Sequence, residues 1–239
     1  MKPVRAILFD FNGVLLDDET FHWRAFQEVL RPFDVTLRRA RYNVRYLVFD
    51  DRSALQAMLR DARLPRAALE DLLRRKRRTY ARLARRLRID PRAAHLVRAV
   101  ARGVPIAVVS GAARSEVEEA LRRAGLARLF GAVVTAEDVR RPKPWPDGYR
   151  LAVRRLGLRS GRGCLAVEDS PGGIRAARAA GLMVVGVATS FSAAVLRRAG
   201  AVRVVRALHD FRMEQLLSPE GTKASDPTVS RRRPIRPRS

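Results

Sequence analysis

The residues best suited to chemistry are acidic residues that directly follow apolar runs. Asp10 follows Val4–Phe9, and Glu168 and Asp169 follow Cys164–Val167. If both runs are buried parallel strands, these carboxylates meet at the carboxyl edge of one sheet, where open α/β sheets bind ligands. Adjacent carboxylates at a strand end are unfavourable without a cation, and an all-oxygen set with room for water suits Mg²⁺. Asp169 alone could instead cap a helix, which would leave Glu168 without a role.

A hydroxyl and a lysine follow in similar positions. Ser110 and Gly111 come after the run Pro105–Val109 and before a helical stretch, where a hydroxyl and free backbone N–H groups suit a phosphate oxygen. Taken alone, a serine at such a position is more often a helix cap. Lys143 lies between two prolines, which hold it in a stiff, extended segment. The chain has four lysines beside 45 arginines, so a compact ammonium at this position indicates a role that a planar guanidinium does not fill.

A sheet is needed to position these residues, and the chain shows the pattern of one. Short apolar runs alternate with amphipathic stretches, which predicts a parallel sheet covered by helices on both faces. The run Val4–Phe9 has no local partner and must join that sheet. The other runs are Pro105–Val109, Ala132–Thr135, Cys164–Val167 and Met183–Val187, and the amphipathic stretches begin near Ser115, Asp147, Pro171 and Ser192. The predicted fold class is α/β, with a doubly wound parallel sheet.

Residues 16–94 differ from the rest of the chain. Residues 19–31 and 53–88 have helical periodicity, are rich in arginine and lack strand signals, and a helix over 91–102 is expected to return the chain to the sheet. We therefore predict a helical insert over 16–94 and a basic disordered tail over 218–239, which holds six cations and two acids. The α/β core is predicted to comprise residues 1–15 and 95–217.

Composition excludes several classes of protein. The 239 residues are 47% apolar, enough to bury a core, and no apolar run is long enough to span a membrane. A signal peptide is not apparent, so we expect a cytoplasmic location. Cys164 is the one cysteine, which excludes an internal disulfide and a cysteine-built metal site. The net charge is +25 and residues 60–102 hold 15 cations and four acids, which predicts non-specific polyanion binding through the insert and tail, or else reflects only an arginine-rich surface.

Taken together and in this order, the motifs resemble those of the haloacid dehalogenase-like (HAD) superfamily, nearest to its phosphoglycolate phosphatase and β-phosphoglucomutase branch. The motifs are Asp10-Phe11-Asn12-Gly13, Ser110-Gly111, Arg141-Pro142-Lys143-Pro144 and Glu168-Asp169, and the resemblance covers roughly residues 4–205. It implies a Rossmann-like core, a helical cap formed by the insert, and a Mg²⁺-dependent phosphatase. The implied substrate is a small phosphorylated metabolite, such as a sugar phosphate or a phosphoglycolate-like ester.

The resemblance also implies roles for individual residues. Asp10 would attack phosphorus and form an aspartyl-phosphate, while Lys143 would neutralise the phosphoryl group and orient Asp10. Ser110 and Gly111 would bind the transferring phosphoryl group. The implied ligands of Mg²⁺ are Asp10, Glu168, Asp169 and the backbone carbonyl of Asn12.

Asn12 departs from the pattern of the family, whose phosphatases usually have a second aspartate there as general acid and base. An amide cannot hold or release that proton at neutral pH. Losing general acid–base help typically slows a reaction by about 10²–10⁴-fold. We expect metal and phosphate binding to persist with reduced turnover, unless a neighbour supplies the proton. The candidates are Asp17, Asp18, Glu19 and His22.

The predicted cap holds three candidate substrate contacts. His22 matches a position common in the mutase-like branch, and Arg52 and Lys76 resemble cap residues that contact a sugar phosphate there; Arg52 could equally be a solvated charge near a helix start. The stretch after Ser110 lacks the polar residues that mutases carry for a distal phosphate, which favours hydrolysis. A phosphosugar mutase and a catalytically weak ligand- or partner-binding member of the family remain as alternatives.

Overall fold

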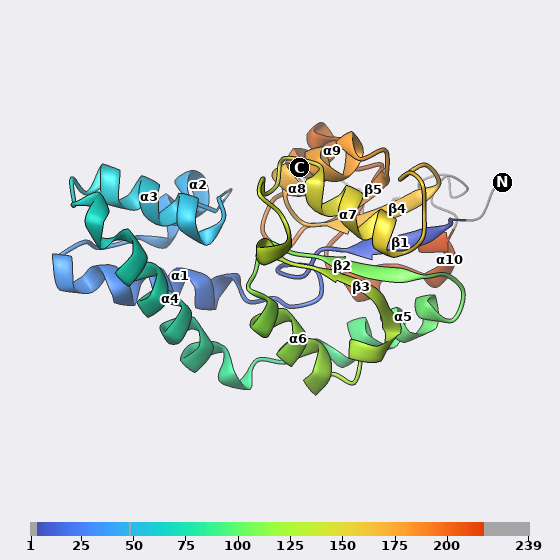
Figure 1. Ribbon diagram of the computed structural model, residues 1–239, viewed down its shortest axis with the longest axis horizontal. Coiled ribbons are helices and arrows are strands. Elements are labelled where there is room, and N and C mark those ends of the chain that lie inside the picture. Colours follow the sequence, from blue (N-terminus) through green and yellow to red (C-terminus); the bar gives the residue numbers. More distant parts are fainter. Residues whose placement is uncertain (1–3, 48, 218–239) are drawn as a thin grey trace, which may run out of the picture.

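The computed structural model describes residues 4–47 and 49–217, within which six strands form one parallel sheet (Figure 1). The sheet order is β3-β2-β1-β4-β5-β6, so successive strands add outward from β1, first on one side and then on the other. This reversal beside β1 creates the crevice in which doubly wound sheets bind ligands. The strands are β1 (Ala6–Phe9), β2 (Ile106–Val109), β3 (Phe130–Val134), β4 (Cys164–Glu168), β5 (Met183–Val187) and β6 (Arg203–Val205). The predicted tail, 218–239, lies outside the described residues.

Both faces of the sheet are buried, as the continuous apolar runs predict. Side chains alternate along β1, so Ile7 and Phe9 enter one hydrophobic cluster while Ala6 and Leu8 enter the other. Helices α7 (Asp147–Arg155), α8 (Pro171–Ala179) and α9 (Ala193–Ala199) cover one face. The opposite face is covered by α5 (Pro91–Ala101), α6 (Arg114–Arg123) and α10 (Met213–Leu217). The predicted α/β class with a doubly wound parallel sheet is confirmed.

The segment between β1 and α5 forms a separate helical unit beside the sheet (Figure 1). Its helices are α1 (Glu19–Leu30), α2 (Arg39–Arg45), α3 (Asp51–Asp61) and α4 (Leu69–Leu83). They enclose their own apolar cluster, in which α1 packs along α4. We call this unit the cap. No helix in the described ranges combines the length and the apolar character needed to cross a membrane.

The structure differs from the sequence expectations in a few elements. The stretch 53–88 is divided into α3 and α4, because Arg63 adopts a left-handed backbone conformation and Pro65 follows it. Strand β6 and helix α2 are not predicted, since one has three half-buried residues and the other is a seven-residue helix with one buried side chain. The expected boundary at residues 94 and 95 falls inside α5, which packs on the sheet from its first turn onward.

Candidate active site

Three carboxylates meet at the carboxyl edge of the sheet. Asp10 directly follows β1, Glu168 is the last residue of β4, and Asp169 comes next. The parallel pairing of β1 with β4, with Phe9 opposite Val167, brings these strand ends level with each other. All three residues are buried, and one oxygen of each lies within 4.8 Å of the others. The edge therefore presents a compact set of oxygen ligands.

Lys143 lies between two of these carboxylates. Its Nζ donates to Asp10 Oδ1 at 2.8 Å, to Glu168 Oε1 at 2.6 Å and to the carbonyl oxygen of Val109 at 3.0 Å. Three acceptors converging on one nitrogen match the three N–H groups of an ammonium. Burial lowers the pKa of Lys143, but the charges of Asp10 and Glu168 raise it above its usual value, so the side chain stays charged.

The negative charge at this edge exceeds what Lys143 neutralises. Burial and the charge of Glu168 raise the pKa of Asp10 to about 7, although Lys143 opposes the shift. Burial and the charges of Asp10 and Glu168 also raise the pKa of Asp169 well above its usual value. Carboxylates held together in this way are stabilised by a bound cation, and hard oxygen ligands with room for water fit Mg²⁺.

Neighbouring hydroxyl groups fix the orientation of the acidic pair. Glu168 accepts from Tyr149 Oη at 2.6 Å on Oε1 and from Ser170 Oγ at 3.1 Å on Oε2, while Asp169 Oδ2 accepts from the hydroxyl of Ser190. Ser170 is also the N-cap of α8 and accepts from Gly173 N at 3.0 Å, so the cap of this helix is not Asp169.

Two glycines leave space for these carboxylates. A Cβ at Gly173 would lie 1.9 Å from Glu168 Oε1, and a Cβ at Gly13 would lie 1.9 Å from Asp169 Oδ2. Gly13 also has a φ of +73°, which disfavours any other residue. The acidic pair therefore depends on glycine at both positions.

Asp10 has one anchored oxygen. Its Oδ1 accepts from the Phe11 backbone N–H at 2.8 Å and from Lys143 Nζ, while Oδ2 accepts no hydrogen bond from the part of the chain that the structure describes. Ser110, which follows β2, accepts from Ala112 N at 2.9 Å and donates to Asn12 Oδ1 at 3.3 Å. Gly111 is exposed beside it. The edge thus combines an available carboxylate oxygen with a nearby hydroxyl.

Asn12 connects this edge to the cap. Its Nδ2 donates to Asp18 Oδ2 at 2.7 Å and lies 3.3 Å from His22 Nε2, which is itself 3.2 Å from Asp18 Oδ2. The hydroxyl of Tyr80 also donates to Asp18 Oδ2. Burial raises the pKa of Asp18, but the charge of His22 and the hydrogen bonds from His22, Tyr80 and Asn12 together lower it below its usual value. Of the four proton-donor candidates, Asp18 and His22 are the two in contact with Asn12.

Lys76 and Arg52, the other two cap candidates, have different surroundings in the structure. Lys76 is fully buried, with Nζ 2.6 Å from His22 Nδ1 and 2.6 Å from each carboxylate oxygen of Asp51. It therefore extends the hydrogen-bonded chain from Asn12 into the cap interior. Arg52 is exposed and pairs with Glu70 at 2.5 and 3.0 Å, so the structure does not bring its guanidinium to the sheet edge.

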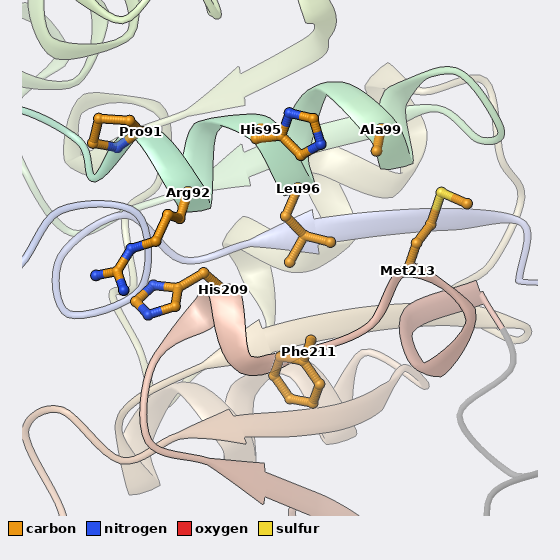
Figure 2. A pocket seen from close by; sticks show the side chains of 8 residues that line it. All are labelled: Pro91, Arg92, His95, Leu96, Ala99, His209, Phe211 and Met213. Atoms are coloured by element: carbon orange, nitrogen blue, oxygen red, sulfur yellow. The ribbon is translucent and has the colours of Figure 1, made fainter.

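A hollow of about 580 Å³ lies away from these residues, between α5 and the segment after β6 (Figure 2). His95 and His209 line it together with apolar side chains such as Leu96 and Phe211. His209 lies 3.7 Å from an oxygen of Asp90, and the hollow contains none of the predicted site residues. Among the described residues, the group of three possible metal ligands lies at Asp10, Glu168 and Asp169 and not in this hollow.

The sequence analysis did not identify several residues that contact the predicted site residues. Ser190 lies three residues after the end of β5, so a search for polar residues shortly after apolar runs could have found it. Tyr149 lies two residues into α7, and nothing in its local sequence indicates a contact with Glu168. Asp51 and Tyr80 come from different cap helices, and only the packing of these helices brings them to Lys76 and Asp18.

Comparisons with known proteins agree with this geometry. Residues 4–181 match the haloacid dehalogenase-like hydrolase family. Validoxylamine A 7'-phosphate phosphatase of Streptomyces hygroscopicus subsp. limoneus is 30% identical over 202 residues, which are 82% of this chain and 91% of that protein. Fructose-1-phosphate phosphatase YqaB of Escherichia coli is 30% identical over 190 residues, 76% of this chain and 95% of that protein.

The chain is also similar to a solved structure in three dimensions. The crystal structure of CbbY from Rhodobacter sphaeroides in complex with phosphate superposes with a TM-score of 0.75 at 29% identity. The superposition covers 87% of this chain and 96% of the other. With its doubly wound sheet, its acidic edge and these matches, the chain belongs to the haloacid dehalogenase-like hydrolase family.

Proposed function

We propose that this protein is a Mg²⁺-dependent phosphatase that hydrolyses a small phosphate ester through an aspartyl-phosphate on Asp10. The observation that supports the proposal best is the hydrogen bonding of the Asp10 carboxylate. Its Oδ1 is held by Lys143 Nζ and the Phe11 N–H, while Oδ2 accepts nothing from the described residues. A carboxylate anchored through one oxygen is oriented to react through the other.

The acidic edge supports magnesium as the cofactor. Asp10, Glu168 and Asp169 would hold the ion, together with the backbone carbonyl of Asn12 that the family resemblance implies. When bound, Mg²⁺ would offset the charge of the carboxylates and of the phosphate, so that one anion can approach the other. The raised pKa values of Asp10 and Asp169 support this, because they reflect buried negative charge that Lys143 only partly neutralises.

Two displacements at phosphorus complete the proposed reaction. In the first, Asp10 Oδ2 forms a bond to phosphorus, the ester P–O bond breaks, and the leaving oxygen takes a proton from solvent water, a proton that the attacking water gives back in the second step. In the second, water attacks phosphorus, the bond to Asp10 breaks, and inorganic phosphate is released. Lys143 and the Ser110 hydroxyl stabilise the transferring group in both steps. Because the Asn12 side chain cannot supply or accept the proton, turnover should be slow for substrates with a poor leaving group.

A sugar phosphate is the substrate class that we favour. The relatives include a fructose-1-phosphate phosphatase and a validoxylamine A 7'-phosphate phosphatase, each 30% identical over most of the chain. The cap contacts the carboxyl edge of the sheet through the hydrogen bond of Asn12 with Asp18, so a substrate bound at Asp10 would also face cap residues. Lys76 and His22 belong to that cap network, whereas Arg52 is paired on its surface.

The test is a panel of phosphate esters assayed for phosphate release with and without Mg²⁺. Asp10→Asn should abolish Mg²⁺-dependent release, since an amide cannot act as the nucleophile. Asp17→Asn is the matched control, because it makes the same change at an exposed aspartate seven residues away. Wild-type turnover in purified Asp10→Asn would refute the mechanism. Dependence on an added sugar bisphosphate would instead indicate a mutase.

A further inference from the structure

Asp18 occupies a position from which it would ordinarily stabilise a helix, yet it does not do so. It is the N-cap residue of α1, and an N-cap aspartate usually accepts a hydrogen bond from the first turn. Within the described residues, its side chain makes no such bond. The carboxylate turns inward instead and is completely buried, which removes the charge from water at a cost in solvation.

The two oxygens of Asp18 have very different surroundings. Oδ2 accepts from Asn12 Nδ2 at 2.7 Å, from the hydroxyl of Tyr80, and lies 3.2 Å from His22 Nε2. Oδ1 is buried with no hydrogen-bond partner among residues 4–47 and 49–217. The donors that stabilise this charge therefore converge on the oxygen that faces Asn12.

This contact determines which way the Asn12 amide points. A carboxylate only accepts hydrogen bonds, so the neighbouring atom of Asn12 has to be Nδ2. The amide oxygen, Oδ1, then faces the carboxyl edge of the sheet, where it accepts from Ser110 Oγ at 3.3 Å. By holding Nδ2, Asp18 makes Asn12 present its acceptor oxygen, and not its donor nitrogen, at the place where the substrate would bind.

We propose that Asp18 is the positioning residue for Asn12. The two residues form an acid–amide pair: the site accommodates one carboxylate, at position 12 or at position 18, with an amide at the other position, but not a carboxylate at both. His22 is placed to serve both arrangements, because its Nε2 lies 3.3 Å from Asn12 Nδ2 and 3.2 Å from Asp18 Oδ2. Exchanging the two residue types would reverse donor and acceptor across one 2.7 Å hydrogen bond. The part of this inference that concerns turnover rests on the proposed function.

The proposed pair predicts that an aspartate at position 12 lowers the stability of the protein as long as position 18 is also an aspartate. In Asn12→Asp, the new carboxylate oxygen would replace a donor 2.7 Å from buried Asp18 Oδ2, with no added cation to separate the charges. Like charges at this distance repel strongly away from water. In Asp18→Asn, the amide of Asn12 and His22 Nε2 would lose the anion to which they donate. Each single change should therefore destabilise the protein.

The experiment is a double-mutant cycle of Asn12→Asp and Asp18→Asn, read first by thermal unfolding without Mg²⁺. We expect both single variants to melt below the wild type and the double variant to recover most of the loss. The control cycle combines Asn12→Asp with Asp17→Asn, which makes the same change at an adjacent but exposed aspartate. Its effects should be additive. A single variant that does not fold, beside a double variant that does, also supports the pair.

The second reading is Mg²⁺-dependent turnover. In the double variant, kcat for an alkyl phosphate such as glycerol 2-phosphate should rise by about tenfold or more over the wild type, since position 12 then holds a carboxyl group. With p-nitrophenyl phosphate, whose leaving group needs no proton, kcat should change much less, and KM should stay similar for both substrates. A merely structural repair would restore both activities equally.

Three results would overturn the inference: additive effects on melting temperature, a double variant that does not fold, or Asn12→Asp alone as stable as the wild type and more active. If the double variant recovers stability but its kcat for the alkyl phosphate does not rise, Asp18 is only a structural partner of Asn12. If neither the wild type nor any variant releases phosphate, the proposed function fails, while the unfolding cycle still decides whether the pair exists.

Discussion

Magnesium binding should depend on pH between about 6 and 8, because the metal and a proton compete for Asp10. Burial and the charge of Glu168 raise the pKa of Asp10 to about 7, and the pKa of Asp169 is raised in the same direction. Below this range the metal has to displace protons from its ligands, whereas above it the carboxylates are already ionised.

The size of the effect follows from the Asp10 pKa. With a value of about 7, roughly one tenth of Asp10 is ionised at pH 6 and roughly nine tenths at pH 8, so the apparent Kd for Mg²⁺ should fall about tenfold, or about 1.4 kcal/mol, over this interval. Ionisation of Asp169 acts in the same direction. Because Asp10 binds its proton more tightly in the folded state, its contribution to stability without metal is present below about pH 4 and is lost as the pH rises through about 7.

Isothermal titration calorimetry at pH 6, 7 and 8 measures the apparent Kd for Mg²⁺ directly. Repeating the titration in buffers of different ionisation enthalpy gives the number of protons released on binding. The increase in melting temperature on adding Mg²⁺ should also be larger at pH 8 than at pH 6. In Asp10→Asn the affinity should be lower and its pH dependence weaker, while Asp17→Asn should retain the wild-type profile. A Kd that is constant from pH 6 to 8, or an unchanged slope in Asp10→Asn, would refute the assignment of the titrating ligand.

Two further substitutions test the geometry of the same edge. Lys143→Arg should lower kcat for phosphate release nearly as much as Lys143→Ala, because a planar guanidinium cannot direct three N–H groups to acceptors that converge on one atom; most of the activity surviving in the arginine variant would contradict this. Gly173→Ala should weaken Mg²⁺ binding and lower the melting temperature, because its Cβ would lie 1.9 Å from Glu168 Oε1. Gly172→Ala, whose Cβ would meet no described atom within 4 Å, should leave both quantities near wild type.

The sequence by itself determined the sheet and the residues at its edge. Runs such as Cys164–Val167 are apolar at every position, a pattern that suits strands buried on both faces. A polar residue directly after such a run has to lie at the carboxyl edge, so the order of residues along the chain is enough to assign Asp10, Ser110 and Glu168 there. Strand β6 was missed because its three half-buried residues carry little of this signal.

Tertiary structure alone decided the partners of these residues, above all in the cap. Four acidic or basic side chains near Asn12 were candidates from spacing, and the structure brings Asp18 and His22 into contact with it, with Tyr80 reaching Asp18 from another helix. Likewise, Lys76 is enclosed within the cap whereas Arg52 pairs on its surface. The physical reason is that helical periodicity tells which face of a helix is apolar but not which neighbour it meets. Contacts between residues as distant as Asp18 and Tyr80 exist only once the cap helices have packed.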